Sequence, residues 1–99
     1  MLKISMNGDL PVATLKLEGK LVGAWARELE RTWQDLWAPT KHKPLRVDIC
    51  EVTFADGTGT RILREIVRTT GAQIVSASPL TQYFADQATS TALLATEEK

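Results

Sequence analysis

Apolar and polar residues alternate along the first part of the chain. In residues 2–6 and again in residues 13–17, every second side chain is apolar. This period of two is typical of β-strands with one buried face. The Asn-Gly-Asp sequence at residues 7–9 is a turn signal, because Asn and Gly tolerate positive φ. The pattern therefore predicts a β-hairpin over residues 2–18.

The hydrophobic period changes after residue 21. The apolar side chains then recur at helical spacing and fit a stripe roughly 120° wide, made of Val22, Trp25, Ala26, Leu29, Trp33, Leu36 and Trp37. The opposite side is charged, so we expect an amphipathic helix that covers an apolar layer. Trp37 lies at the edge of the stripe, and we expect it to be the tryptophan that is partly exposed. Pro39 ends this helix.

A second alternating segment, residues 45–50, predicts a strand that ends near Cys50, followed by a loop over residues 51–53. Further on, helical spacing returns. We expect the apolar stripe of this second helix to consist of Ile62, Leu63, Ile66 and Val67, with Arg61, Arg64, Glu65 and Arg68 on the far side. Gly71 is expected to end the helix as its C-cap. Residues 72–77 are nearly continuously apolar and predict a short strand.

The third predicted helix begins with Ser78 as N-cap and Pro79 at its first position. We expect Leu80, Phe84 and Ala88 to face the core. Residues 89–99 are expected to be a frayed tail or a short helix. The order β-β-α-β-α-β-α predicts an α/β protein with one domain, residues 1–99 with a core over about 2–88. Its mixed sheet has an N-terminal hairpin, then parallel strands, with the helices mainly on one face.

Composition narrows the classes of function. The 99 residues include 12 Lys and Arg and 12 Asp and Glu, and this net charge of zero argues against nucleic acid as a partner. Cys50 is the single cysteine, so an intrachain disulfide is impossible and a cytoplasmic location is expected. No apolar run approaches the roughly 20 residues that cross a bilayer, so we expect no direct membrane insertion.

The segment "FADGTGTRI", residues 54–62, occupies a loop where sites form in such sheets, at the carboxyl end of a parallel strand. It lacks the lysine of a phosphate-binding loop and the third glycine of a dinucleotide fingerprint. A turn that starts a helix is the favoured interpretation, with Asp56 or Thr58 as its cap. A helix N-terminus also attracts anions, so a nucleotide or small-anion site at Thr58–Thr60 remains an alternative.

The sequence lacks the residues that nucleophilic catalysis or metal binding would require. His42 is the only histidine and lies in a polar loop between two lysines. A dyad of Cys50 and His42 would be required for nucleophilic catalysis, and the sequence gives no reason for them to meet. No Cys and His residues have zinc-site spacing. The residues therefore predict no catalytic group, no metal site and no cofactor.

Three segments together resemble the STAS domains, a family that includes the bacterial anti-sigma-factor antagonists. "LKLEGKL" at 15–21 is similar to the strand that precedes the first helix of the family. "RVDICEVTFADGTGTRILREI" at 46–66 is similar to its central strand, switch loop and second helix, and "GAQIVSASP" at 71–79 to its next strand. The similarity spans about residues 2–88. It implies a non-enzymatic protein-interaction module that takes part in bacterial signalling and transcription regulation.

The sequence also departs from that family. In the antagonists, the residue after the loop aspartate is the serine or threonine that a partner kinase phosphorylates, and here it is Gly57. Thr58 matches the second hydroxyl position and is the remaining candidate for phosphorylation. Val22 replaces an aspartate of the family, and the usual last strand and helix are expected to be reduced or absent. The resemblance thus implies docking without the usual phospho-switch.

The resemblance also implies where a partner would dock. The expected partner is an anti-sigma factor of the kinase type, and the alternative is the ATPase of a lipid-transport complex with this chain as accessory subunit. We expect the chain to be a monomer or a weak homodimer that uses a sheet edge or Trp37. The residues expected to bind the partner are Asp56, Gly57, Thr58, Gly59, Thr60, Arg61, Arg64 and Lys20.

Overall fold

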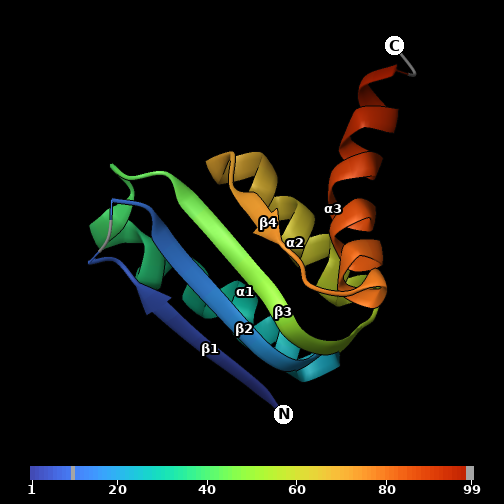
Figure 1. Cartoon of the computed structure of the whole chain (residues 1–99), viewed down its shortest axis with the longest axis horizontal. Coiled ribbons are helices and arrows are strands. Elements are labelled where there is room, and N and C mark those ends of the chain that lie inside the picture. Colours follow the sequence, from blue (N-terminus) through green and yellow to red (C-terminus); the bar gives the residue numbers. More distant parts are fainter. Residues whose placement is uncertain (10, 98–99) are drawn as a thin grey trace.

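A computed structural model describes residues 1–9 and 11–97, with side chains through Thr89. The predicted order of elements is confirmed, with one added 3-10 turn (Figure 1). The elements are β1 (Leu2–Asn7), β2 (Ala13–Leu21), α1 (Gly23–Trp37), the 3-10 turn η1 (Ala38–Thr40), β3 (Leu45–Ala55), α2 (Gly57–Thr70), β4 (Gln73–Val75) and α3 (Pro79–Glu97).

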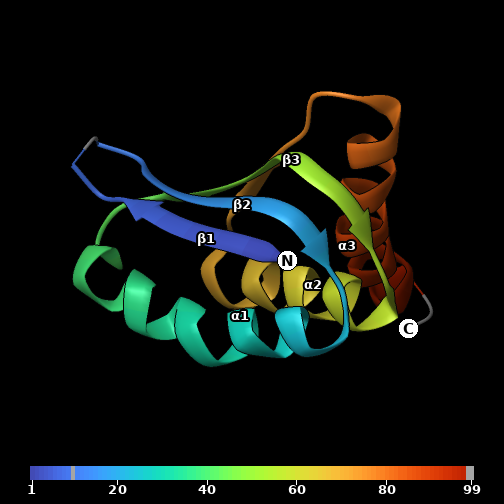
Figure 2. The same ribbon diagram turned by 90° about the horizontal axis from the view of Figure 1, so that it is seen from below.

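The four strands form one mixed sheet in the order β1-β2-β3-β4. β1 pairs antiparallel with β2, and the β2–β3 and β3–β4 pairs are parallel. Because the sheet order follows the chain order, right-handed crossovers place both connecting helices on the same side. Figure 2 shows α1 and α2 beneath one face of the sheet, while α3 stands beside α2 and the end of β3. The expected α/β fold with helices mainly on one face is confirmed.

β3 is longer than the sequence predicts. The strand continues to Ala55, so the expected end near Cys50 and the loop over 51–53 are wrong. The pairing with β2 shifts register twice, and the first shift places three steps of β3 opposite two steps of β2. These irregularities break the period of two that the prediction used. The buried residues of β3 are spaced by two and then by three: Leu45, Val47, Ile49, Val52 and Ala55.

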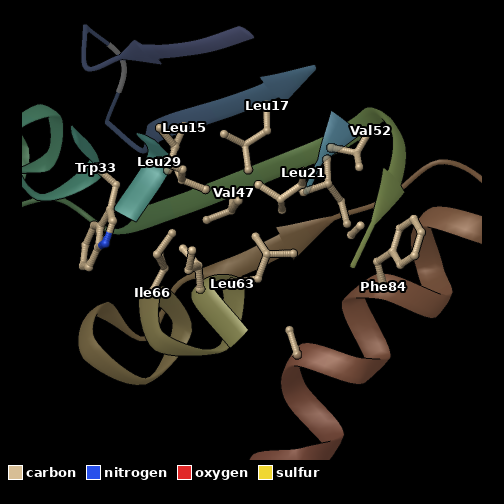
Figure 3. Close-up of a cluster of buried hydrophobic side chains, with 14 of the residues drawn as sticks. Leu15, Leu17, Leu21, Leu29, Trp33, Val47, Val52, Leu63, Ile66 and Phe84 are labelled. Atoms are coloured by element: carbon tan, nitrogen blue, oxygen red, sulfur yellow. The ribbon is translucent and has the colours of Figure 1, made fainter. Parts of the chain in front are cut away.

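The core lies between the sheet and the two helices beneath it. In Figure 3, side chains of α1 and α2 meet those of β2 and β3, with Trp33 at one end of the cluster and Phe84 of α3 at the other. Trp33 is 2% exposed, and its ring centroid lies 5.8 Å from that of the half-buried Trp37. Trp37 is partly exposed as expected, but Trp25, in the first turn of α1, is more exposed at 44%, which the sequence did not predict.

The cap predicted for α3 is confirmed. The Ser78 hydroxyl accepts a hydrogen bond from the Thr81 N–H, and the Thr81 hydroxyl accepts one from the Ser78 N–H, each 3.0–3.1 Å long. Thr81 takes the buried position in this first turn. The prediction that Leu80 faces the core is therefore wrong, whereas Phe84 and Ala88 are buried as expected.

The ends of α2 and α3 follow local sequence. Gly71 caps α2 with a left-handed φ of 72°, as predicted. α3 continues to Glu97, so residues 89–97 extend this helix and form no separate element. This segment is rich in Ala and Leu and has no Gly or Pro to end a helix. Residues 98 and 99 of the expected tail lie outside the described residues.

Candidate functional site

The loop between β3 and α2 is organised by Asp56. This residue is the N-cap of α2, and its Oδ1 atom accepts a hydrogen bond of 2.8 Å from the Gly59 N–H. Its backbone oxygen accepts from the Thr60 N–H and from the Thr60 hydroxyl, both at 2.9 Å. Of the two caps that the sequence leaves open, Asp56 is the one observed.

The same carboxylate also holds the start of α1. The Gly23 N–H, in the first residue of α1, donates a 3.0 Å hydrogen bond to Oδ2 of Asp56. The partial positive charges of two helix N-termini therefore converge on one carboxylate. The hydrogen bond from Gly59 lowers the pKa of Asp56, and those from Gly23 and Thr58 add to this effect, against the opposing effect of partial burial. Asp56 thus remains ionised and joins the β2–α1 turn to the β3–α2 loop.

The two glycines of the loop have different surroundings. Gly59 is buried, and a Cβ atom there would collide with the carbonyl oxygen of Leu21 and lie 2.8 Å from its Cγ. Gly57 is exposed, and a Cβ atom there would meet no atom within 4 Å. Gly59 is therefore required for the close approach of α2 to β2, whereas position 57 has room for any side chain.

The two threonines of the loop also differ. The Thr60 hydroxyl is used by the hydrogen bond to Asp56. Thr58 is half-buried, and its hydroxyl makes no hydrogen bond within the part of the chain that the structure describes. The Thr58 hydroxyl is thus the one that remains available to a partner or a kinase.

The basic residues expected at the site lie around this loop. Lys20 is exposed on β2 and pairs with Phe54 of β3, two residues before Asp56. Arg61 is exposed on α2, and its guanidinium lies 3.5 Å from a carboxylate oxygen of Glu30 on α1. Arg64 is half-buried on the same helix. The structure therefore brings Lys20 to the loop and places both arginines along the helix that the loop starts.

Sequence reasoning missed an apolar surface next to the loop. Phe54 is 52% exposed, Tyr83 57% and Leu80 47%. The ring of Phe84 links two of them, because its centroid lies 6.3 Å from that of Phe54 and 5.9 Å from that of Tyr83. Aromatic residues are enriched in protein interfaces. This surface was not predicted, because Phe54 was placed after the end of the strand and Leu80 in the core. The sequence did contain one indication of it: Phe54 and Tyr83 are aromatic residues that belong to none of the predicted apolar helix stripes.

The structure does not pair Cys50 with His42. Cys50 is the sixth residue of β3, and its thiol faces the backbone oxygen of Val75 at 3.8 Å. In the described part of the chain no hydrogen bond joins it to His42, which lies in the loop before the strand. The side-chain hydrogen bond with Asp48, followed by burial and by the charges of Asp48 and Glu51, raises the pKa of the Cys50 thiol. A thiol in this environment is not activated as a nucleophile.

Two further features concern metal binding and the crossing of a membrane. Among residues 1–9 and 11–97, no group of three or more His, Cys, Asp or Glu side chains is arranged to hold a metal ion. No helix in the described part of the chain is long and apolar enough to cross a membrane.

The fold matches solved structures, whereas no protein-family model and no curated protein matches the sequence. An anti-sigma factor antagonist from Mycobacterium paratuberculosis matches with a TM-score of 0.72 and 20% identity, over 84% of this chain and 74% of that one. The protein Mglu matches with a TM-score of 0.58 and 19% identity, over 76% of this chain. This match spans only 19% of the length of Mglu. The similarities show that the chain has the fold of an anti-sigma factor antagonist, the STAS fold.

Proposed function

We propose that this protein is a non-enzymatic interaction module of the STAS type that docks a regulatory protein in the cytoplasm. The docking surface consists of the loop Asp56–Thr60, the adjoining face of α2, and the β2–α1 turn with Lys20. The observation that carries the proposal is the hydrogen bonding of Asp56 to Gly23 and Gly59, which holds the turn and the loop together as one preformed surface.

A preformed surface favours binding, because little conformational entropy is lost when a partner docks. The exposed side chains of Phe54, Leu80 and Tyr83 add an apolar area beside the loop. By resemblance, the partner is an anti-sigma factor of the kinase type. Gly57 stands at the position of the phosphorylated hydroxyl in that family, so the proposed module docks without the usual phospho-switch.

The alternative of an anion or nucleotide site finds less support. The first N–H groups of α2 would have to bind the anion. Two of them, from Gly59 and Thr60, already donate to Asp56. The ionised Asp56 carboxylate would also repel a phosphate. The role of accessory subunit in a lipid-transport ATPase complex uses the same docking surface and differs only in the partner.

Site-specific photo-crosslinking in the source cell tests the proposal. A photoreactive residue is placed at position 57, where a side chain meets open space, or at His42 as an exposed control in the 41–44 loop. We expect one protein to crosslink strongly from position 57 and not from position 42. If the crosslinked protein is identified as an anti-sigma kinase or as a transport ATPase, this decides between the two candidate partners. Identical products from both positions would refute the docking surface.

A further inference from the structure

Three arginines form a continuous stripe along α2. Arg61, Arg64 and Arg68, here called the arginine stripe, are spaced at i, i+3 and i+7 and therefore lie on one side of the helix, away from its buried residues. The stripe extends about 10 Å along the helix at 1.5 Å per residue. Like charges at such spacing disfavour the isolated helix. Glu65 offsets this repulsion in part, and the helix dipole favours Arg68 in the last turn. The stability of α2 therefore explains Arg68 better than it explains Arg61 and Arg64.

Within the described residues, the charge of Arg61 is compensated by a single exposed ion pair. Glu30 of α1 lies 3.5 Å from Arg61, and the two side chains remain 43% and 50% exposed. Glu65 is the only acid in α2, whose residues thus carry three positive charges against one negative charge. An exposed ion pair contributes little to the stability of a protein, so one of its two partners is easily replaced by another group of the same charge. A carboxylate from outside could therefore replace Glu30 at Arg61.

A shallow hollow of about 280 Å³ lies on this side of α2, lined by Arg61, Arg64, Glu65 and Arg68. Small-molecule pockets have volumes of about 300–1,000 Å³ and mostly apolar linings. The hollow is smaller and lined by charged side chains, so it suits the carboxylate side chains of a protein.

Other anionic macromolecules fit less well. The net charge of the whole chain is zero, which disfavours a nucleic acid backbone. Binding to anionic lipids typically uses clusters of about four to eight Lys or Arg, and the stripe has three arginines with Glu65 among them. Arginine pairs with carboxylates in a planar, bidentate geometry. We propose that the arginine stripe docks an acidic segment of a protein partner, whose carboxylates pair with its two exposed arginines, Arg61 and Arg68.

This inference rests on the proposed function and names the chemistry of the partner. Its test uses an alanine-based helical peptide of about 15 residues, with glutamates at i, i+3 and i+7, and a control peptide with glutamines there. Amide chemical shifts of the labelled protein are followed during titration. We expect the glutamate peptide to shift amides of α2 at about millimolar concentration, more weakly when the ionic strength rises to about 0.5 M. The glutamine peptide should cause no such shift.

The matched variants place the same charge reversals on the two helices. Arg61→Glu/Arg68→Glu changes the two exposed arginines of the stripe, and Arg27→Glu/Arg31→Glu changes two exposed arginines of α1. The first should weaken binding of the glutamate peptide by about tenfold, and the second by much less. Equal binding of the two peptides, equal effects of the two variants, or no shift of α2 amides would overturn the inference. Tighter binding of duplex DNA or of phosphatidylserine vesicles to the stripe would also overturn it.

The inference and the proposed function can fail separately. If the protein that crosslinks from position 57 binds the Arg61→Glu/Arg68→Glu variant as tightly as the wild type, the inference is wrong and the proposed function stands. If the glutamate peptide binds the stripe while no protein crosslinks specifically from position 57, the stripe is supported and the proposed function fails.

Discussion

The Oδ2 atom of Asp56 lies 3.0 Å from the backbone nitrogen of Gly23, a residue 33 positions earlier in the chain. Its other carboxylate oxygen lies 2.8 Å from the nitrogen of Gly59. One side chain therefore caps α2 and fixes the start of α1. The loop that would dock a partner is held by the same contact that joins the two helices of the layer beneath the sheet.

Removal of this carboxylate should destabilise the fold. Asp56→Ala loses the cap of α2 and the hydrogen bond to Gly23, and we expect a loss of about 1–3 kcal/mol in the free energy of unfolding. Asp35→Ala, at an exposed position of α1, is the matched control and should change the free energy of unfolding by less than about 0.5 kcal/mol. Urea denaturation measures both, and equal values would show that Asp56 has no structural role.

The stability should also depend on pH through Asp56. Its pKa is lowered in the folded protein, chiefly by the hydrogen bond from Gly59, so the folded state binds its proton less readily than the unfolded state. The contribution of the Asp56 carboxylate to the free energy of unfolding is therefore complete above the unfolded-state pKa of about 3.9. It is lost as the pH falls through the lower folded-state pKa. The difference in unfolding free energy between wild type and Asp56→Ala should be constant from about pH 5 to 8 and shrink below about pH 4. A difference that grew on acidification would contradict this assignment.

The two loop glycines offer a comparison within one turn of helix. Gly59→Ala forces a Cβ atom against the carbonyl oxygen of Leu21, and we expect it to cost about 1–3 kcal/mol of stability. Gly57→Ala meets open space at the start of α2, so it should be neutral or stabilise the protein by up to about 1 kcal/mol. Thermal or urea denaturation of the pair provides the test. The reverse ranking would show that the approach of α2 to β2 differs from the one described.

Phosphorylation tests the loss of the switch. Given ATP and an anti-sigma kinase, wild-type protein should gain no phosphate at residue 57, because Gly57 has no hydroxyl. Gly57→Ser should restore an acceptor, since its side chain enters open space beside the capping Asp56. Intact mass and peptide mapping locate any phosphate. Robust modification of Thr58 in the wild type would contradict constitutive docking and indicate that Thr58 has replaced the usual acceptor.

The order of elements was predictable because short-range patterns set it. The caps at Ser78 and Gly71 and the apolar stripe of α2 follow from local sequence alone. β3 was predicted too short because two register shifts against β2 break its alternation, and pairing of distant strands is not visible in a local pattern. The exposure of Trp25, 44%, likewise depends on how α1 packs in the folded chain, and the spacing of apolar residues along the helix does not reveal this.

In the candidate site, too, local features were predictable from the sequence and contacts between distant residues were not. The glycines and Asp56 of the loop stood out in the sequence, and the resemblance to STAS domains placed Lys20 near them. The contact of Asp56 with Gly23 could not be predicted from spacing, because it depends on how α1 and α2 lie side by side. The exposed Phe54 and Tyr83 were missed for the same reason, since β3 and α3 meet only in the folded chain.

The affinity of the crosslinked partner for Gly57→Glu protein tests the central claim most directly. Glutamate at the first position of α2 is compatible with the helix dipole and enters open space, so the fold should be retained. The matched control is His42→Glu, which adds the same charge in an exposed loop before β3. Calorimetric titration should show binding weakened by about tenfold or more for Gly57→Glu and unchanged for His42→Glu. Equal affinity of wild type and Gly57→Glu would contradict docking at this loop.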